Sequence, residues 1–487
     1  MATVADSARA RCSSLLIDPA LASLAPAIER ALDRLDRPLV VAVTGHVSAG
    51  KSTLVNALAG RPVTETGATE TTLVSWWLRR GTDERVVVKL RAGAPLILGI
   101  GDELTAAEDE LDLDAVEPIT VWLNSPMLED LVIVDTPGLF SPNDERSARA
   151  RELVHARTGR ASAGADAVVH VTAEAPGAKR EAAELDAFAA GFPDLGHAPT
   201  NALIVMTKAD RYWPASADPR ATAGAALDSA RAAWRSRAWQ AIPVAALLAQ
   251  ARLVEADREL LAQLAGREPL DSAIRVIAAR ARSGRAAPAE TDLLRRLGPY
   301  GVVVAARAVG SGADPGAALR AASGIDEVRQ AIDQMFRART QTMRTDRMLR
   351  ELEALAFGRE LAPAASARLR SAVDDVRAGQ DGGGLRVLLA LRLAADPRVR
   401  LPDAARDEVR TVFATPTAGD RLVPPGSPVP AVPRALARDR ARWWRALEMV
   451  RPSAPDRRWL AAQVAAAYDR IARDSDGANA TAETPGR

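Results

Sequence analysis

Short apolar runs alternate with longer segments of helical period between residues 37 and 285. This alternation is typical of an α/β domain with a mostly parallel sheet and helices on both faces. The predicted strands are Leu39–Thr44, Leu73–Leu78, Val86–Leu90, Ile119–Leu123, Leu131–Asp135, Ala167–Thr172, Ala202–Thr207 and Gln240–Val244. Ligands of such sheets lie at the carboxyl ends of the parallel strands, so site residues are expected there.

The stretches on either side show only the period of helices. Between residues 1 and 36, apolar residues recur every three or four positions and predict one amphipathic helix that ends at Pro38 and packs against the C-terminal part of the chain. Its apolar positions are Leu15, Leu16, Leu21, Leu24, Ile28, Leu32 and Leu35. From residue 286 the strand signals stop, and we expect helices over 289–310, 315–358 with a break near Gly324, 362–378, 385–395, 402–414, 431–449 and 455–473.

These patterns divide the chain into a helix, two larger parts and a tail. Residues 1–36 form the N-terminal helix, residues 37–285 an α/β domain, and residues 286–474 an all-α region. The small, polar residues 475–487 form a tail that we expect to be disordered.

Composition narrows the class of protein. The 487 residues include 64 Lys and Arg and 62 Asp and Glu, and this near balance argues against a strongly basic nucleic-acid-binding protein. The single cysteine, Cys12, excludes an internal disulfide and a cysteine-based zinc site, and indicates a reducing compartment. Residues 1–11 lack the apolar core of a signal peptide, and no stretch approaches the roughly 18 uninterrupted apolar residues of a spanning helix. We therefore expect a protein that is free of the membrane or bound only at its surface.

A glycine-rich loop follows the first predicted strand and precedes a predicted helix. It reads Gly45-His46-Val47-Ser48-Ala49-Gly50-Lys51-Ser52-Thr53. Strand, glycine loop and helix in this order are the context that a phosphate-binding P-loop requires, with Lys51 reaching the β- and γ-phosphates and the Ser52 hydroxyl binding Mg²⁺. The backbone N–H groups and the positive end of the helix point at the same anion. The alternative, a plain glycine turn before a surface helix, rarely follows a buried strand.

A second motif, Asp135-Thr136-Pro137-Gly138, directly follows a predicted strand. A carboxylate at a strand end can bind Mg²⁺ opposite Ser52, directly or through water, and the N–H of Gly138 can reach the γ-phosphate. The alternative is an ordinary aspartate at the junction of a strand and a turn.

Threonines gather between these two motifs. They stand at Thr64, Thr66, Thr69, Thr71 and Thr72. A switch loop there would supply one hydroxyl to Mg²⁺ and one N–H to the γ-phosphate. Thr72 is the first candidate and Thr71 the second, because the next predicted strand starts directly after them. The alternative for each threonine is a solvated loop residue.

A third motif, Thr207-Lys208-Ala209-Asp210, follows another predicted strand and selects the base. The carboxylate of Asp210 can accept two hydrogen bonds from the N1–H and N2–H₂ edge of guanine, and adenine offers no such pair of donors. The aliphatic stem of Lys208 can lie over the ring. The nucleotide is therefore expected to be GTP or GDP, unless the motif is a simple surface turn. Val244-Ala245-Ala246 is a weaker candidate for a loop that covers the base.

The order of these motifs resembles the dynamin superfamily, and within it the bacterial dynamin-like GTPases of the isoniazid-inducible (IniA/IniC) type. The resemblance is carried by Gly45–Asn56, Ala68–Thr72 running into Trp76, Asp135–Gly138, Leu293–Gly301, and Ser323–Ile325 leading to Ile332–Phe336. It covers residues 1 to about 360 well and the remainder loosely.

The resemblance implies a P-loop GTPase domain followed by an all-α neck and stalk. The N-terminal helix would join the neck with residues 325–358 and 455–473, and the tip of the stalk would contact lipid. Carried over residue by residue, Ser52, Thr72 and Asp135 would bind Mg²⁺; Lys51, Ser48 and Thr72 would take part in catalysis; and Gly138, Thr207, Lys208 and Asp210 would keep their nucleotide roles.

The same resemblance implies partners and a location. Expected are a homodimer, or a heterodimer with another dynamin-like protein, a membrane lipid surface as a partner, and no nucleic acid. The expected place is the cytoplasm, peripheral at the inner face of the cell membrane.

One position departs from the pattern of dynamins proper. They carry a glutamine that positions the attacking water where this chain has Val47, whose side chain can neither donate nor accept a hydrogen bond. His46 can substitute if its ring turns inward, whereas the alternative is a loop histidine that faces solvent. We therefore expect slow hydrolysis unless a partner assists, and a low-activity, nucleotide-gated partner of another dynamin-like protein is the alternative function.

Three features of the helical region have two interpretations each. Residues 385–393, with Arg386 and Arg392, form either an interfacial helix or, as we favour, a stalk core helix with exposed arginines. Of Trp443 and Trp444, one is expected in the core and the other at an interaction surface. The arginines at 337, 339, 344, 347 and 350 are expected to be a solvated helix face rather than a phosphate site, and the loop 415–433 is either a lipid contact or a connector.

Overall fold

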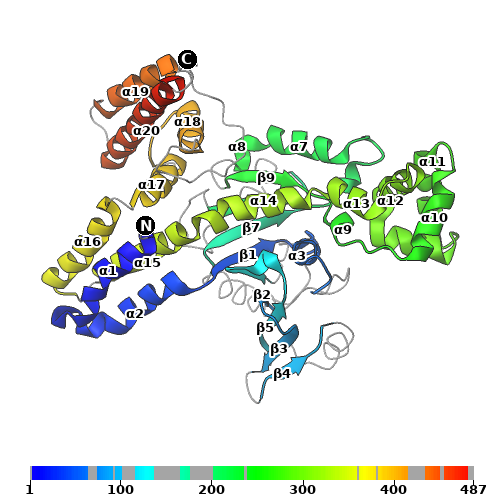
Figure 1. Ribbon diagram of the computed structural model, residues 1–487, viewed down its shortest axis with the longest axis horizontal. Coiled ribbons are helices and arrows are strands. Elements are labelled where there is room, and N and C mark those ends of the chain that lie inside the picture. The colour runs from blue at the N-terminus through cyan, green and yellow to red at the C-terminus, as the bar shows by residue number, and fades with distance from the viewer. Residues whose placement is uncertain are drawn as a thin grey trace, which may run out of the picture. The chain divides into compact units, whose positions relative to one another are not determined.

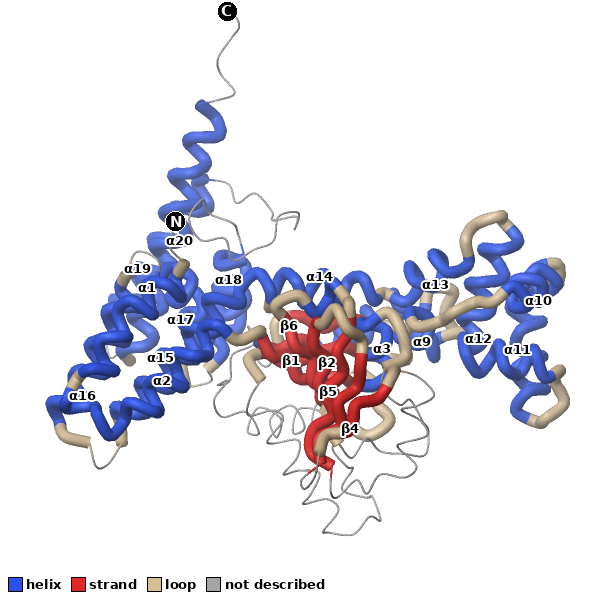
Figure 2. Tube along the Cα trace, turned by 60° about the horizontal axis from the view of Figure 1, so that its bottom comes forward, coloured by secondary structure: helices blue, strands red, loops and turns tan. Residues whose placement is uncertain are grey.

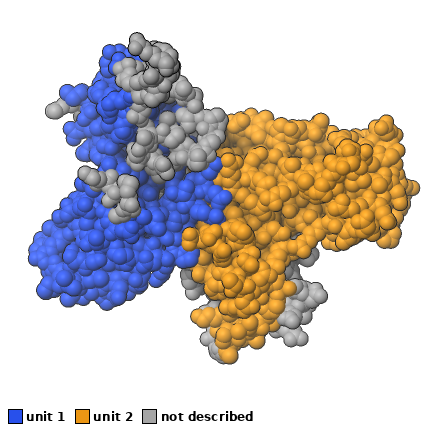
Figure 3. All heavy atoms as spheres, in the orientation of Figure 1, with its two compact units in different colours: residues 1–39, 193–201, 333–487 blue, residues 40–192, 202–332 orange. Residues whose placement is uncertain are grey.

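The described chain divides into two compact units, which Figure 3 shows in blue and orange. Unit 1 comprises residues 1–39, 193–201 and 333–487, and unit 2 comprises residues 40–192 and 202–332. The computed structural model describes residues 3–63, 74–90, 94–100, 116–136, 165–175, 201–234, 238–358, 361–379, 382–396, 398–414, 434–449 and 454–480.

Unit 2 is built on one nine-stranded sheet, drawn in red in Figure 2. The strands are β1 (Leu39–Gly45), β2 (Trp76–Arg80), β3 (Arg85–Leu90), β4 (Leu96–Leu98), β5 (Val116–Leu123), β6 (Leu131–Asp135), β7 (Ala167–Thr172), β8 (Ala202–Met206) and β9 (Gln240–Pro243). Their order across the sheet is β4-β3-β5-β2-β6-β1-β7-β8-β9. Strand β7 pairs in parallel with β1 and β8, β8 with β9, and β2 with β5, whereas β3 is antiparallel to both its neighbours and β2 to β6. This mixed, mostly parallel sheet followed by a helical region confirms the predicted fold class.

Several strand ends shift by a few residues, and β5, for example, begins at Val116 and not at Ile119. Two further differences concern β2 and β4. Strand β2 begins at Trp76, not at Leu73. Strand β4 was not predicted, because it is a three-residue edge strand whose Leu96 and Ile97 are exposed and show no alternation of apolar and polar residues. Both differences lie on the side of the sheet away from β8 and β9.

Unit 2 also contains helices, some between its strands in the sequence and some after the last strand. The described helices that begin in it are α3 (Lys51–Ala59), α7 (Pro219–Ser229), α8 (Arg231–Trp234), α9 (Ala246–Ala249), α10 (Glu255–Ala265), α11 (Leu270–Arg282), α12 (Pro288–Gly310), α13 (Pro315–Ser323) and α14 (Ile325–Met335). Figure 1 shows α10, α11 and α12 gathered at one end of this unit. They enclose an apolar core with Leu261, Ile274, Leu297 and Leu319.

The unit boundary differs from the sequence-based division at residue 285. Residues 286–332 belong to the compact unit that contains the sheet, because α12 and α13 bury their apolar faces against α9, α10 and α11. The period of a helix shows that it has an apolar face, but not which surface that face covers.

The prediction that residues 1–36 form one helix is wrong, whereas the prediction that their apolar positions are packed against the C-terminal part of the chain is confirmed. The segment forms α1 (Val4–Cys12), α2 (Ala25–Asp33) and 3-10 turns between and after them. Asp18 accepts a hydrogen bond from the N–H of Ala20 and Pro19 follows it, so a new turn starts there and the helix is interrupted. Leu15, Leu21, Ile28, Leu32 and Leu35 are nevertheless buried, and they pack against residues 348–385 as predicted.

Helix α15 (Thr340–Ala356) is the centre of unit 1, and this overturns the prediction of a solvated arginine face. Arg339, Arg344 and Arg347 are buried, since α1 and α2 pack on α15 together with α16 (Pro363–Ala378) and α17 (Gly383–Ala395). The 3-10 turn at Arg337–Arg339 separates α14 from α15, a second break in the predicted helix 315–358. Protein groups hold the enclosed guanidinium groups; Arg344, for example, donates to the carbonyl of Leu35.

Helix α17 is a core helix, as the favoured interpretation of residues 385–393 predicted, but its two arginines are half-buried and not exposed as expected. Leu385, Leu388 and Leu391 are buried. Its arginines are held by protein groups and are not free for lipid: Arg386 donates to the carbonyls of Arg377 and Gly379, and Arg392 donates to Asp346.

The last helices form a separate group within unit 1. They are α18 (Asp403–Ala414), α19 (Arg434–Met449) and α20 (Pro455–Ala480). Helix α20 packs chiefly on α19, α17 and α18, so the prediction that the last helix joins the N-terminal helices is wrong; α16 packs there instead. It also continues to Ala480, beyond residue 473 where the sequence placed its end. Among the described helices, none is long and apolar enough to cross a membrane.

A buried ion pair inside unit 1 provides a stability test. Asp346 accepts hydrogen bonds from Arg350 at 3.1 Å and from Arg392 at 2.6 Å. Burial works against the charged carboxylate, yet the two guanidinium groups outweigh it and hold the pKa of Asp346 below its usual value. Asp346→Ala leaves two enclosed cations without their partner and should lower the free energy of unfolding by about 3–5 kcal/mol.

Urea unfolding of the full chain, followed by circular dichroism, measures this change. The control is Asp439→Ala, which removes an exposed pair with Arg442 and should change stability by about 0.5 kcal/mol or less. Equal unfolding midpoints for the two variants would contradict the structural role of Asp346.

Candidate nucleotide-binding site

The P-loop connects the end of β1 to the start of α3 and depends on two glycines. Gly45 has φ 143°, and a Cβ there would lie 2.1 Å from the carbonyl oxygen of Val171 in β7, so no side chain fits. Gly50 precedes α3 with φ 91°, in the left-handed region that favours glycine. Its missing side chain leaves room for Thr207, whose Oγ1 would be 3.2 Å from a Cβ. The loop is thus wrapped closely between β7 and the residue after β8.

Lys51 and Asp135 lie together at the base of this loop. Asp135 ends β6 and is fully buried, and Lys51, the first residue of α3, is 6% exposed. The Lys51 Nζ donates to the carbonyl of His46 at 2.9 Å. Burial lowers the pKa of Lys51, and the charge of Asp135 partly offsets this effect.

The carboxylate of Asp135 fits a divalent cation. Burial raises its pKa to about 6, although Lys51 and the Ser52 hydroxyl both lower it. Neither carboxylate oxygen has a hydrogen bond of good geometry. A buried carboxylate of this kind beside a P-loop serine is a suitable pair of oxygen ligands for Mg²⁺. Ser52 and Asp135 are therefore the described residues that can hold the metal.

Thr207 and Lys208 hold the P-loop from the far side. The Thr207 hydroxyl donates to the carbonyl of Ala49 and also lies 3.2 Å from the carbonyl oxygen of Thr172. Lys208, with φ 59°, places its Nζ 2.5 Å from the carbonyl oxygen of Ser48. The side chain of Lys208 therefore extends across the loop, toward the place where a bound base and ribose would lie.

Asp210 belongs to the 3-10 turn Ala209–Tyr212 and is partly buried. Burial raises the pKa of its carboxyl, and the neighbouring Arg211 and Lys208 act in the opposite direction. The N–H of Ala209 donates to the carbonyl of Val244, and the N–H of Val244 donates to that of Met206. The weak candidate Val244-Ala245-Ala246 is thus buried and braces the Asp210 turn.

A histidine that the sequence analysis missed lies beneath the P-loop. His170 is buried in β7, in register with Thr44 of β1. Burial and the nearby His46 and Lys51 lower its pKa to about 3, so its imidazole is neutral. The Nε2 atom of His46 is buried as well, so its ring turns inward and does not face solvent. The one available signal was a histidine inside the apolar run Ala167–Thr172.

The end of α3 involves two further residues that the sequence analysis missed. Buried Asn56 accepts the N–H of Val63 at 2.8 Å, which fixes the chain where it leaves α3. Arg329 of α14 donates to the carbonyls of Ala57 at 2.8 Å and Leu58 at 3.2 Å. A cation at these carbonyls also interacts favourably with the negative end of the helix dipole. No pattern in the sequence links Arg329 to a helix so distant along the chain.

The structure brings residues 45–53, Asp135, Thr207, Lys208 and Asp210 to one edge of the sheet. Thr71, Thr72 and Gly138 lie outside the described residues, so their predicted roles stay predictions.

The order of these parts is that of a known family. A sequence model of the dynamin family matches residues 41–184. Residues 41–184 belong to the dynamin family. Membership of this GTPase family implies that the domain binds a guanine nucleotide, which agrees with the prediction from Asp210.

Two named relatives match the chain over a short range. The isoniazid-induced protein IniC of Mycobacterium tuberculosis is 36% identical over 129 residues, which are 26% of this chain and 26% of that protein. Dynamin-like protein 2 of Campylobacter jejuni is 27% identical over 119 residues, which are 24% of this chain and 20% of that protein. The chain therefore spans about a quarter of the length of the curated relatives it matches.

The solved structures that are similar to this chain include one from "an oligomerised bacterial dynamin pair", described in connection with the long-range sensing and tethering of membranes. It is 12% identical and covers 98% of this chain and 75% of its own, with a TM-score of 0.36.

The hydroxyl of Thr207 provides a test of the bracing of the P-loop. Thr207→Val keeps the shape of the side chain but removes the donor to Ala49, so the affinity for GDP should fall about fivefold, the value of one net hydrogen bond. Isothermal titration calorimetry measures the affinity. The control is Thr411→Val in α18, whose hydroxyl donates to the carbonyl of Asp407 in its own helix. Equal affinities for wild type and Thr207→Val would show that this contact does not support binding.

Proposed function

We propose that this chain binds GTP with Mg²⁺ at the P-loop and hydrolyses it to GDP. The observation that supports this proposal is the buried pair of Lys51 and Asp135 at the base of a loop whose Gly45 and Gly50 have backbone conformations that favour glycine. A cation and a carboxylate are kept there at the expense of their hydration, in a cradle of backbone N–H groups suited to phosphates. A plain structural turn would need neither charge.

In the proposed reaction, water attacks the γ-phosphorus in line with the bond to the β–γ bridging oxygen, which breaks and leaves GDP and inorganic phosphate. The Nζ of Lys51 exchanges its bond with the His46 carbonyl for phosphate oxygens and stabilises their developing charge. Ser52, Thr72 and Asp135 would hold Mg²⁺, which would neutralise charge on the β- and γ-phosphates. In this proposal both residues take part in catalysis, Ser48 from the P-loop and Thr72 from the switch loop.

Asp210 and Lys208 recognise the base. The carboxylate of Asp210 accepts the N1–H and N2–H₂ donors of guanine, and the stem of Lys208, held by its contact with Ser48, covers the ring. Burial of the Asp210 carboxyl strengthens such bonds, because they compete less with water.

Slow turnover is part of the proposal. Val47 has no polar atom for the attacking water. This lack favours the second candidate function, a nucleotide-gated partner that hydrolyses little alone and pairs with another dynamin-like protein. Pairing through the GTPase domains, with a second copy or with such a relative, rests on the family resemblance.

The central test is GTP turnover by the purified full chain. Lys51→Ala should abolish both turnover and tight binding, because the phosphates lose their main cation. Lys89→Ala, at an exposed position of β3, is the matched control and should behave as wild type. Turnover that survives Lys51→Ala would refute the proposed site. Nucleotide binding with very slow turnover, raised by another dynamin-like protein, would favour the second candidate.

We also propose a lipid-contacting face on α19. Trp444 is buried and donates to Glu408, whereas its neighbour Trp443 is 37% exposed beside the exposed Leu436. The guanidinium of Arg440 lies 4.6 Å from the Trp443 ring centre. The sequence spacing of Leu436, Trp443 and Leu447 places all three on one side of the helix. An exposed tryptophan with arginines nearby suits the headgroup region of an anionic membrane.

Co-sedimentation with vesicles that contain anionic lipid tests this face. Trp443→Ser should reduce the bound fraction several-fold, because it removes the largest apolar group that can enter the interface. Phe357→Ser is the matched control, since Phe357 is a more exposed aromatic residue elsewhere in unit 1. Equal loss in both variants, or no loss in Trp443→Ser, would exclude α19 as the contact.

A further inference from the structure

The backbone of α12 meets the carboxylate that the proposed function assigns to guanine. Helix α12 is kinked at Gly298, which has φ 66° and ψ 165°. A Cβ on Gly298 would lie 3.8 Å from the Oδ2 of Asp210 and 3.7 Å from the Cδ2 of Leu247. The helix therefore reaches the Asp210 turn with bare backbone, at the only sharp bend within α12.

The sequence explains why the bend stands at this position. Pro299 has no N–H for the helix, and its ring disfavours the helical conformation of the residue before it. Gly298 then takes a backbone conformation that is almost restricted to glycine. Both residues belong to the segment Leu293–Gly301, which carried part of the family resemblance but has no place in the nucleotide chemistry described above.

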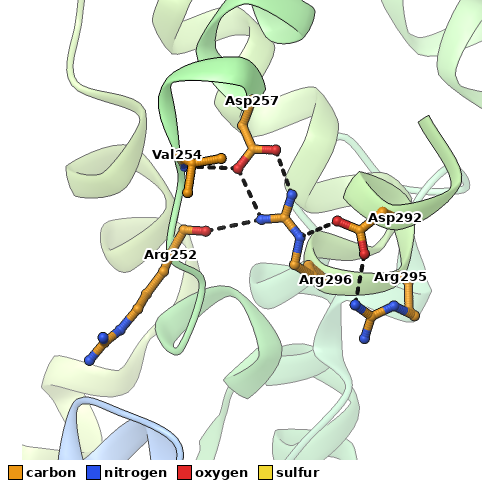
Figure 4. A network of polar contacts seen from close by, with 6 residues as sticks. All are labelled: Arg252, Val254, Asp257, Asp292, Arg295 and Arg296. Atoms are coloured by element: carbon orange, nitrogen blue, oxygen red, sulfur yellow. Dashed lines mark hydrogen bonds and ion pairs between the residues drawn. The ribbon is translucent and has the colours of Figure 1, made fainter. Parts of the chain in front are cut away.

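Contacts on both sides hold the kink in place. Before it, Arg296 donates to both oxygens of Asp257, to Asp292 and to the carbonyl of Arg252, so this part of α12 is tied to the start of α10 (Figure 4). After it, Gly301 lies against Leu248 of α9, where a Cβ would be 3.4 Å from that side chain. The bend cannot slide along the Asp210 turn without breaking these contacts.

Residues Ser323 and Gly324, at the end of α13, hold the loop Val244-Ala245-Ala246. The carbonyl of Ser323 accepts the N–H of Ala245 at 2.9 Å. Gly324, with φ 75°, leaves room for Arg220, whose guanidinium would be 2.5 Å from a Cβ. Arg220 in turn donates to the carbonyl of Pro243 at the end of β9. The loop that braces the Asp210 turn is therefore itself braced by residues far along the chain.

We propose that the α12 kink determines base specificity, because Gly298 lets the helix backbone close one side of Asp210 and hold its carboxylate in the plane of guanine. This inference rests on the proposed function of Asp210. Guanine offers two donors, N1–H and N2–H₂, and both carboxylate oxygens must be aligned to accept them. Hypoxanthine lacks the 2-amino group, so ITP uses only one oxygen. The ratio of the affinities for GTP and ITP therefore measures the alignment of Asp210.

The test compares this ratio in wild type and Gly298→Ala, with fluorescent analogues of GDP and IDP or by calorimetry with the nucleotides themselves. An alanine is strained at Gly298 and adds an atom toward Asp210, so the preference for guanine should fall about tenfold while binding of the inosine nucleotide changes little. A general loss of folding or of phosphate binding would lower both affinities together and leave the ratio unchanged.

The matched control is Gly312→Ala. Gly312 follows α12, has φ 73°, and has open space around the position that a Cβ would take, with no atom within 4 Å. The substitution therefore adds similar backbone strain without touching the site, and its affinity ratio should equal that of wild type. Pro299→Ala is the second variant: it introduces no strain but permits a straighter helix, and it should also lower the ratio. If Gly298→Ala does not fold, Pro299→Ala alone decides.

The outcomes separate this inference from the function on which it rests. A wild-type chain that does not prefer guanine over hypoxanthine overturns the role of Asp210, and the inference with it. A wild-type preference that persists unchanged in Gly298→Ala and Pro299→Ala overturns only the role of the kink. A ratio that falls in these variants and not in Gly312→Ala supports it.

Discussion

The close approach of the P-loop to strand β7 is the constraint on which the nucleotide site depends. Gly45 has no side chain, so the carbonyl of Val171 in β7 can lie where a Cβ would be. The chain can therefore turn from β1 into the loop directly at the end of the sheet. The loop is then closed from the other side by Thr207, which fills the space that Gly50 leaves open. Lys51 and Asp135 are both buried near the loop, so their charges interact in a poorly solvated place.

The two units use buried charge in opposite ways. In unit 1, Asp346 is surrounded by Arg350 and Arg392, and the carboxylate is satisfied. In unit 2, the carboxylate of Asp135 is buried without a hydrogen bond of good geometry and its pKa is raised. A satisfied pair holds a fold together, whereas a carboxylate left incomplete retains free energy for binding a cation. This contrast separates the structural charges of the chain from those that suit a ligand.

Residues 286–332 connect the helical part of the sequence to the Asp210 turn. They belong to the compact unit of the sheet, where Gly298 meets the Asp210 turn and Ser323 binds Ala245. Arg329 of the same segment reaches the end of the P-loop helix. The helices after the sheet thus contact the Asp210 turn, the loop that braces this turn and the end of the P-loop helix, and a division of the chain at residue 285 would cut through these contacts.

The sequence by itself determined eight of the nine strands, the P-loop and the motif residues, because strand period, glycine spacing and residue chemistry are local properties. It also showed that one of Trp443 and Trp444 must be buried, since neighbours on a helix point apart. Only the tertiary structure decided which surfaces the helices cover: the arginines of α15 are enclosed, α20 joins α17–α19, and α12 reaches Asp210. Helical period records that a face is buried but carries no information about its distant partner, and the roles of His170, Arg329 and Gly298 arise from such partners.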